Sequence, residues 1–489
     1  MLKQKSLSRN ALIYTIKVVT SMIFPLITFP YISRILLAEG VGKYNFSYTY
    51  ISYFQLLASL GISTYAIREG AKIRDDNVRL NNFAQEIFSI NILSTMISMI
   101  LLFVSLICVP SLNAYRNIIC ILSISIPMIT IGTEWIFSGK EEFTFITIRT
   151  ILFQILSLSL MFLFVKNKND VCAYGLISVI ATAGANITNF FYARKYFDHK
   201  IVISSNLKKH LKSILILFVA VVASQIYVNI DITMLGFIKG DYATGIYSAS
   251  SKIYNIVRSL LTAFIAVILP RLANILVTES KIQYEKLLKK ILNAFLILVL
   301  PSALGLILLA KSAVILLSGK SFEAAVLPLR ILSIALVFSV IGSFIANSIL
   351  IVFSEERKIL YATIVGAIVN VILNVYFIEK YSFIGAAVTT LISEMIVFLI
   401  QLYYARKCCK IGLKRDDLLK EIISIVIMTG CYKITKQIEL SNFFMFFLEI
   451  VVCALTYLLS LVLLKNSVAM KYFGLVFRYI RRRDKNENQ

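Results

Sequence analysis

A few ionisable side chains lie inside long apolar stretches of this chain, where a charge is costly unless it has a task. An ionisable residue at the centre of a membrane-spanning helix costs about 2.5–3.5 kcal/mol or more, so such residues tend to face a cavity. We expect the cations to bind an anionic substrate and the acids to bind a coupling ion. The cations are Lys17, Arg34, Arg149, Lys252 and Arg258, and the acids are Asp231 and Glu394.

Lys252 is the deepest of the cations. It lies nine or ten residues into the apolar stretch 243–270, which is about 15 Å along a helix at 1.5 Å per residue. Asn255 and Ser259 follow at i+3 and i+7 and make a polar stripe too wide for one ion pair. We therefore favour a cation that lines a central cavity over the alternative, an ion pair with Asp231 that only locks the bundle.

The other polar residues within apolar stretches have structural alternatives. Lys17, Arg34 and Arg149 could instead extend their charged ends to a membrane interface. Asparagines recur at helical spacing within two stretches, and hydrogen bonding between helices is the role we expect for them. These are Asn186, Asn189, Asn370 and Asn374.

Signatures of other chemistry are absent from the sequence. The two histidines, His199 and His210, both lie in the polar segment 194–212, which excludes a histidine-based catalytic or metal site within the membrane. No phosphate-cradling GxxxxGK[ST] motif occurs, and the seven cysteines form no CxxC pair. We therefore predict no enzymatic activity, no metal and no cofactor, and transport driven by a gradient or a potential.

The composition predicts the elements that hold these residues. The chain has 489 residues, 58% of them hydrophobic, and a mean hydropathy of +0.82. Apolar stretches of about 20 residues recur from end to end, as in an all-α polytopic membrane protein, and no alternating β-barrel strands are seen. About 14 spans are predicted, at residues 10–36, 44–67, 83–109, 115–137, 145–165, 171–193, 211–237, 243–270, 288–310, 324–352, 360–379, 383–405, 419–436 and 443–464.

The net charge of +24 follows membrane topology, not nucleic-acid binding. Most Lys and Arg residues lie in alternate loops, which predicts that both termini are cytoplasmic. The basic N-terminus has no small-residue cleavage site after its apolar stretch, so we expect a retained signal anchor.

The two halves of the chain echo each other. Gly42-Lys43-Tyr44 recurs as Gly245-Ile246-Tyr247, 203 positions later, and Tyr192-Ala193-Arg194-Lys195 recurs as Tyr404-Ala405-Arg406-Lys407. An even number of spans in each copy gives both copies one orientation, which is a parallel repeat. We predict an N-terminal lobe at residues 1–205 (spans one to six), a C-terminal lobe at 206–410 (spans seven to twelve), and spans thirteen and fourteen with a basic cytoplasmic tail at 411–489.

These segments together resemble the Wzx-type polysaccharide repeat-unit flippases. That family belongs to the superfamily of the multidrug and toxin extrusion exporters and the lipid II flippases. The resemblance covers nearly the whole chain, and one departure is Leu36-Leu37-Ala38, where Leu-Gly-Pro or similar is expected. The residues that carry it are Phe24–Arg34, Gly61–Glu69, Glu134-Trp135, Gly139, Glu142-Phe143, Arg149, Asp231, Leu235-Gly236, Gly245–Ser248, Lys252-Ile253 and Pro270-Arg271.

The resemblance implies a two-lobed transporter of the cell (inner) membrane that works by alternating access. It would carry undecaprenyl-pyrophosphate-linked oligosaccharide to the outer leaflet for O-antigen or capsule assembly, coupled to the membrane potential or an ion gradient. The polysaccharide polymerase and the chain-length machinery are further candidate partners, beside the lipid bilayer. A glycan with a diphosphate of about −2 charge needs a hydrated cationic cavity, which agrees with the basic residues within the spans.

Two other classes remain as alternatives. A drug or cation antiporter of the multidrug and toxin extrusion type would favour an acidic, aromatic cavity over one rich in Lys and Arg. A membrane-embedded glycosyltransferase or polymerase would need an acidic catalytic cluster and a longer outer loop than the dozen or so residues present.

Overall fold

The computed structural model describes residues 7–204, 206–437 and 442–471, and its regular structure there is entirely helical. Ten segments of this part are long and apolar enough to cross a membrane. The chain is therefore an all-α polytopic membrane protein. Fourteen spans stay a prediction, because three of the ten segments are longer than one crossing requires and are broken near their middle.

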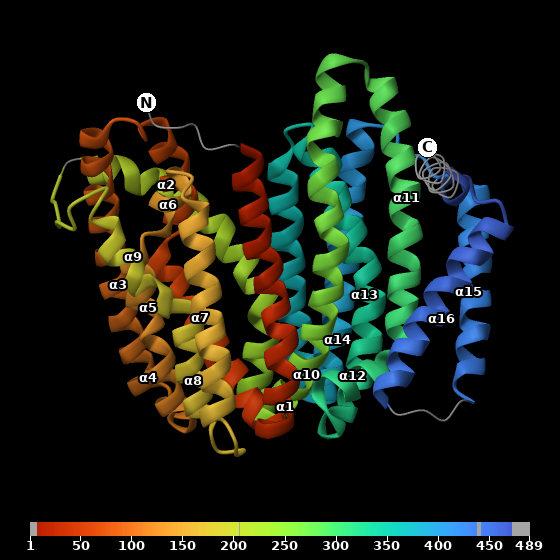
Figure 1. The fold of residues 1–489 in the computed structure, drawn as a ribbon, viewed down its shortest axis with the longest axis horizontal. Helices are drawn as coiled ribbons and strands as arrows, with labels where there is room; N and C mark the ends of the chain where they lie inside the picture. Colours follow the sequence, from red (N-terminus) through yellow and green to blue (C-terminus); the bar gives the residue numbers. More distant parts are fainter. Residues whose placement is uncertain (1–6, 205, 438–441, 472–489) are drawn as a thin grey trace, which may run out of the picture. The chain divides into compact units, whose positions relative to one another are not determined.

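The chain forms two compact units, which meet between Ser248 and Ala249 inside one long helix. The predicted lobes, with their boundary near residue 205, stay a prediction. The helices of the first unit run side by side (Figure 1). They are α1 (Leu7–Ser59), α2 (Ile62–Lys72), α3 (Asn77–Cys108), η1 (Pro110–Tyr115), α4 (Arg116–Ser123), α5 (Ser125–Gly132), α6 (Glu134–Gly139), α7 (Phe143–Phe164), α8 (Val171–Val179), η2 (Ile180–Gly184), α9 (Ala185–Ala193) and the beginning of α10 (Asn206–Thr278).

The second unit contains the rest of α10 and the helices that follow it. They are α11 (Lys281–Leu308), α12 (Ala310–Ser318), η3 (Lys320–Ala325), α13 (Val326–Ile345), η4 (Ala346–Ile351), α14 (Glu356–Cys408), α15 (Arg415–Thr435) and α16 (Asn442–Leu463). In this unit α15 and α16 pack against each other and against α11 and α12. The Tyr432 hydroxyl fastens α15 to α11 by donating to the carbonyl of Leu308 at 2.7 Å.

Three long helices are each broken once by a residue with a positive φ. These residues are Leu37 in α1 (φ 57°), Gly240 in α10 (φ 76°) and Ser382 in α14 (φ 52°). Each break lies at or between the ends of spans predicted from the sequence, where an apolar stretch gives way to a turn. We call the parts of α1 and α10 before and after the break their first and second arms.

The first unit is held together by α1. Its arms pack against α3, α4, α5 and α7. The second arm of α1 also meets the first arm of α10, where the Phe46 ring fills the space beside Gly236 and the hydroxyls of Tyr53 and Thr233 lie 2.8 Å apart. Helix α1 is thus the centre around which the other helices of this unit are arranged.

Two local breaks set the backbone near the polar network of this unit. Thr133 has a left-handed φ of 38°, so it ends α5 and starts the short helix α6 at Glu134. The π-helical turn η2 directly precedes α9, and Ala185 is the first residue of α9. Such π turns widen the helix and are frequent at functional sites. Gly132 brings α5 close to α9, because a Cβ at this position would collide with the side chain of Asn186.

Candidate functional site

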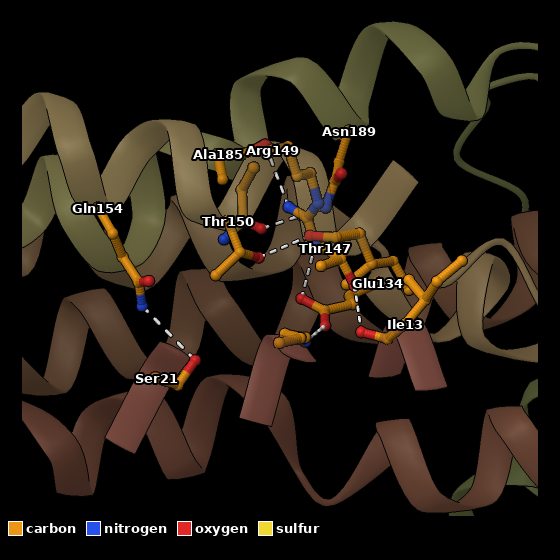
Figure 2. A network of polar contacts seen from close by, with 12 residues as sticks. Ile13, Ser21, Glu134, Thr147, Arg149, Thr150, Gln154, Ala185 and Asn189 are labelled. Atoms are coloured by element: carbon orange, nitrogen blue, oxygen red, sulfur yellow. Dashed lines mark hydrogen bonds and ion pairs between the residues drawn. The ribbon is translucent and has the colours of Figure 1, made fainter. Parts of the chain in front are cut away.

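One carboxylate lies between two of the cations named from the sequence. The Lys17 ammonium on α1 is 2.8 Å from one oxygen of Glu134, and Nη2 of Arg149 on α7 is 2.9 Å from the other. Figure 2 shows Arg149, Glu134 and their neighbours in this network. Two positive charges share one negative charge, so the cluster carries a net charge of about +1, which adjacent helices hold within the apolar part of the unit.

Arg149 is the most enclosed member of this cluster, with a side chain only 6% exposed. Its Nη1 donates to the carbonyl of Ala185 at 3.2 Å, at the point where η2 passes into α9. Its Nε–H has no acceptor among the residues that the structure describes. A buried guanidinium has five donors in a fixed fork, and a donor left unused in a buried place can be satisfied by a ligand or by water.

Further contacts fix α7 against α1 beside the cluster. The Thr147 hydroxyl donates to the carbonyl of Ile13 at 3.2 Å. The Gln154 amide reaches the Ser21 hydroxyl at 3.5 Å, as Figure 2 shows. These two bonds lie on either side of Arg149 along α7. They therefore fix the position of α7 along α1, and with it the position of the guanidinium beside Glu134.

Asp231 lies in the first arm of α10 and is also buried. The Tyr247 hydroxyl donates to its Oδ2 at 2.6 Å. A charge-assisted bond of this length holds a carboxylate in one orientation. Tyr53, whose hydroxyl contacts Thr233, lies within electrostatic reach of the same acid.

The second unit contains the remaining residues of the predicted deep site. Glu394 on α14 is buried, and Tyr254 interacts electrostatically with both Glu394 and Arg258. Lys252 is half-buried on the second arm of α10. On the same helix the Asn255 amide donates to the Ser251 hydroxyl at 3.1 Å, along the polar stripe predicted there.

Arg34 lies apart from the Lys17–Glu134–Arg149 cluster. It is exposed on the first arm of α1, and its Nη1 donates to the carbonyl of Pro30 at 2.6 Å. The structure thus brings Lys17 and Arg149 together around Glu134, and it places Arg258 and Glu394 each within electrostatic reach of Tyr254.

Glu134 is the residue of this site to which the sequence analysis gave no role. The available signal was an acid in the apolar stretch 115–137. An intramembrane carboxylate needs a cationic partner, and two such cations had already been named. Sequence spacing alone could not pair them, because Lys17 and Glu134 lie on different helices that only tertiary packing brings into contact.

Comparisons with known proteins identify the family of the chain. Residues 7–276 match the family described as polysaccharide biosynthesis protein. An Escherichia coli K12 protein named "Putative O-antigen transporter" is 25% identical over 403 residues, covering 82% of this chain and 97% of that protein. The "Capsular polysaccharide biosynthesis protein CapF" of Staphylococcus aureus is 27% identical over 383 residues, covering 76% of this chain and 91% of that protein.

Two solved structures share the fold. A lipid II flippase, MurJ, in an inward closed conformation aligns with a TM-score of 0.76 at 18% identity, over 95% of this chain and all of that one. An inward-facing multidrug resistance transporter of the MATE family aligns with a TM-score of 0.61 at 12% identity, over 81% of this chain and 97% of that one. With more than half of its length matched, the chain belongs to the polysaccharide biosynthesis protein family, which confirms its resemblance to the Wzx-type flippases.

Proposed function

We propose that this protein moves undecaprenyl-pyrophosphate-linked oligosaccharide repeat units from the cytoplasmic to the outer leaflet by alternating access. The family and the names of the relatives support a flippase of polysaccharide biosynthesis. The diphosphate and the sugars would cross within the protein while the lipid tail stays in the bilayer. The glycan would serve O-antigen or capsule assembly, and the protein would lie in the inner membrane with both termini cytoplasmic.

The observation that carries the proposal is the cationic cluster of Lys17 and Arg149 around a single carboxylate. A diphosphate carries about two negative charges, and a cation 4 Å from a phosphate oxygen gains roughly 4 kcal/mol at an effective dielectric of 20. Arg149 has a donor with no acceptor among the described residues. A phosphate oxygen would satisfy this donor, and the surplus positive charge of the cluster would offset part of the cost of removing the diphosphate from water.

The other cations extend this function along the transport path. Lys252 and Arg258 lie six positions apart on the second arm of α10, about 1.7 turns of the helix, and Arg34 is exposed on α1. We assign Lys17, Arg34, Arg149, Lys252 and Arg258 to substrate binding. Several moderate sites favour transport over one tight site, because the substrate must leave as readily as it enters.

The membrane potential can supply the driving force. Moving about two negative charges outward across an inside-negative potential is downhill by roughly 4–5 kcal/mol per 100 mV. Asp231 and Glu394 are buried carboxylates, and we assign them to a coupling proton or sodium ion that enters as the glycan leaves. The polymerase and the chain-length machinery would receive the product.

A charge reversal at Lys252 tests the proposal in cells. A strain without its own copy of the gene would express Lys252→Glu, Lys252→Gln or the wild-type chain. We expect Lys252→Glu to abolish surface polysaccharide and to cause lipid-linked oligosaccharide to accumulate, while the protein stays in the membrane. Lys239→Glu is the matched control, because Lys239 is exposed on the same helix and its reversal should leave display intact. Normal display in Lys252→Glu would refute the assignment.

A drug or cation antiporter is the main alternative on this fold. Such a protein would bind apolar cations, which the surplus positive charge around Arg149 would repel. If the purified protein exports an organic cation against a proton or sodium gradient and leaves lipid-linked oligosaccharide on one leaflet, the proposal is wrong.

A further inference from the structure

A cavity in the first unit has polar walls that carry no charge. It lies between the second arm of α1, α5 and the first arm of α10, and has a volume of about 290 Å³. This volume is close to the lower limit of small-molecule sites. Its polar walls include Tyr48, Ser52, Gln55, Ser59, Gln225 and Asn229.

Two helix faces make these walls. On α1 the spacing of Tyr48, Ser52, Gln55 and Ser59 is i, i+4, i+7 and i+11, which places all four side chains on one face. They extend over about 16 Å at 1.5 Å per residue. On α10 the two amides, at positions 225 and 229, are one turn apart. Polar residues that recur with this periodicity inside two apolar helices form a continuous strip instead of scattered hydrogen-bonding groups.

The hydroxyls of Ser52 and Ser59 donate to the carbonyls of Thr49 and Leu56 on their own helix, but the amides of this strip keep hydrogen-bonding groups that the protein does not use. The Gln55 amide donates to the Ser125 hydroxyl at 2.6 Å, which leaves its carbonyl oxygen as an acceptor. The Asn229 amide reaches the Ser52 hydroxyl only at 3.5 Å, the outer limit of a hydrogen bond. The Gln225 side chain forms no hydrogen bond with another residue that the structure describes, so its amide offers two donors and an acceptor.

Tyr48 adds an aromatic surface to the cavity. Its side chain is exposed, and its ring stacks on Tyr44 with centroids 5.8 Å apart and an interplanar angle of 24°. Stacking holds the ring in one orientation at the cavity wall. A tyrosine combines an apolar face with a polar hydroxyl, and a pyranose ring has the same two features in its C–H face and its hydroxyl groups.

The chemistry of these walls selects among possible ligands. A diphosphate would require cations, and the cavity lining contains none. An apolar drug would leave the amides and hydroxyls unpaired, at a cost for each. Sugar hydroxyls both donate and accept, as amides and hydroxyls do. We infer that this cavity binds sugar residues of the lipid-linked oligosaccharide and selects the glycan; the inference rests on the proposed function.

The sequence repeat between the two halves of the chain supports separate binding of the glycan and of the diphosphate. At the offset of 203 positions that relates Gly42 to Gly245, Thr49 corresponds to Lys252 and Gln55 corresponds to Arg258. Two neutral lining residues of the first copy, Thr49 and Gln55, are thus replaced by cations in the second copy, whereas Tyr48, Ser52 and Ser59 correspond to the neutral Ser251, Asn255 and Thr262. A substrate with a neutral glycan and an anionic diphosphate presents two chemically different parts. The uncharged lining of the first copy suits the glycan, and the two added cations of the second copy suit the diphosphate.

Transport of two substrates by the same proteoliposomes tests this inference. One substrate is the complete lipid-linked repeat unit, extracted from a strain that lacks the flippase. The other is undecaprenyl diphosphate carrying a single N-acetylhexosamine. A membrane-impermeant periodate treatment measures how fast each glycan reaches the other leaflet. The variants are Gln225→Ala with Asn229→Ala, Tyr48→Leu and Lys252→Gln, and the control is Ser224→Ala, one position before Gln225 and exposed.

We expect the double amide variant to slow transport of the complete repeat unit about 25-fold, because it removes two hydrogen bonds to neutral groups and each is worth roughly a factor of five. The single-sugar substrate should slow by less than about twofold in the same variant, which also shows that the protein is folded. Tyr48→Leu should act in the same direction. Lys252→Gln should slow both substrates alike, and Ser224→Ala neither.

The outcomes separate this inference from the proposed function. If the amide and Tyr48 variants slow both substrates equally, or neither, the cavity does not select the glycan. If the wild-type protein moves neither substrate, the proposed function fails and the inference fails with it. If the double variant moves neither substrate, Gln225→Glu with wild-type Asn229 decides the question. A carboxylate retains hydrogen-bond acceptors, so this variant should restore part of the difference in rate between the two substrates if the cavity binds sugar.

Discussion

Gly42 and Gly245 cross so closely that neither position has room for a side chain. A Cβ at Gly42 would collide with the carbonyl oxygen of Asp241, and a Cβ at Gly245 would collide with that of Ala38. Each of these carbonyls lies four residues before the opposite glycine. The two contacts are therefore equivalent under the offset of 203 positions, and the second arms of α1 and α10 meet in a symmetric crossing that supports the predicted repeat. Small residues allow this close approach between helices in membranes.

Alanine at either glycine of the crossing should destabilise the protein. The obstructing atoms are backbone, which cannot rotate away, so we expect Gly42→Ala or Gly245→Ala to cost about 1–3 kcal/mol and to lower the melting temperature in detergent. Gly305→Ala is the control, because a Cβ there meets nothing within 4 Å. That helical glycine should gain up to about 1 kcal/mol from alanine. Equal melting temperatures for all three variants would contradict a tight crossing.

Removing the carboxylate between Lys17 and Arg149 should leave a buried cation without its partner. Breaking a buried pair costs about 3–5 kcal/mol, but Glu134 is 44% exposed, so we expect roughly 1–3 kcal/mol for Glu134→Gln. Because Arg149→Met removes the unpaired charge, the double variant should be more stable than the sum of the single effects by about 1–2 kcal/mol.

Denaturation of the four proteins of this cycle in mixed micelles measures that coupling. Arg68→Met serves as the comparison, since Arg68 is exposed and pairs with its neighbour Glu69 at 2.9 Å. An exposed pair is worth about 0–1 kcal/mol, so this variant should change little. Strict additivity in the Glu134–Arg149 cycle would show that the pair contributes no specific interaction.

His199 should make stability depend on pH. Its ring lies 4.3 Å from the rings of Phe190 and Phe197 and 5.4 Å from that of Phe88. Burial, with the nearby Arg194 guanidinium acting in the same direction, lowers the pKa of His199 below its usual value of about 6.5. The unfolded chain then binds more protons than the folded chain between these two pKa values, so the free energy of unfolding rises with pH in this range.

The contribution of His199 to stability is therefore complete above about pH 6.5 and is lost as the pH falls through this value toward the folded-state pKa. Melting curves of wild type and His199→Phe between pH 8 and pH 5 measure it. We expect the wild type to lose more stability than the variant on acidification. Every other titrating group is common to both proteins and cancels in the difference. Parallel curves would show that His199 titrates alike in both states.

Substitution of Asp231 should distinguish transport driven by an ion gradient from transport driven by the membrane potential. In proteoliposomes with the lipid-linked repeat unit, we expect Asp231→Asn to lose stimulation by an imposed proton or sodium gradient. It should keep stimulation by an inside-negative potential, because the diphosphate itself carries the charge that the potential moves. Tyr247→Phe removes the 2.6 Å bond to this carboxylate and should weaken the gradient response without abolishing it. Transport by the wild type that ignores both gradients and voltage would refute the coupling.

The all-helical, membrane-spanning class of the chain could be predicted because it depends on local properties. A helix must be apolar over about 20 residues to cross, and the breaks at Leu37, Gly240 and Ser382 occur where such stretches end. The number of crossings is harder to predict, because α1 and α14 each continue across a break with little loss of helical pattern.

The candidate site could be predicted only as separate residues. Lys17 and Arg149 were named because a cation is costly in an apolar stretch, yet the carboxylate that holds both, Glu134, was left without a role. The energetic cost of a single charged residue in an apolar stretch can be recognised from the sequence. An ion pair, in contrast, exists only when packing brings two helices together.

Amino-acid order alone was enough for the class of protein, for the charged residues within its apolar stretches and for the echo of Gly42 in Gly245, because these follow from hydropathy, charge and spacing along one chain. Tertiary structure was needed to show that Lys17 and Arg149 share Glu134, that the two glycines touch, and that Tyr48, Gln55 and Gln225 line one uncharged cavity. The reason is that these contacts join different helices, and most of them join residues more than a hundred positions apart, so only the packing of helix faces selects them.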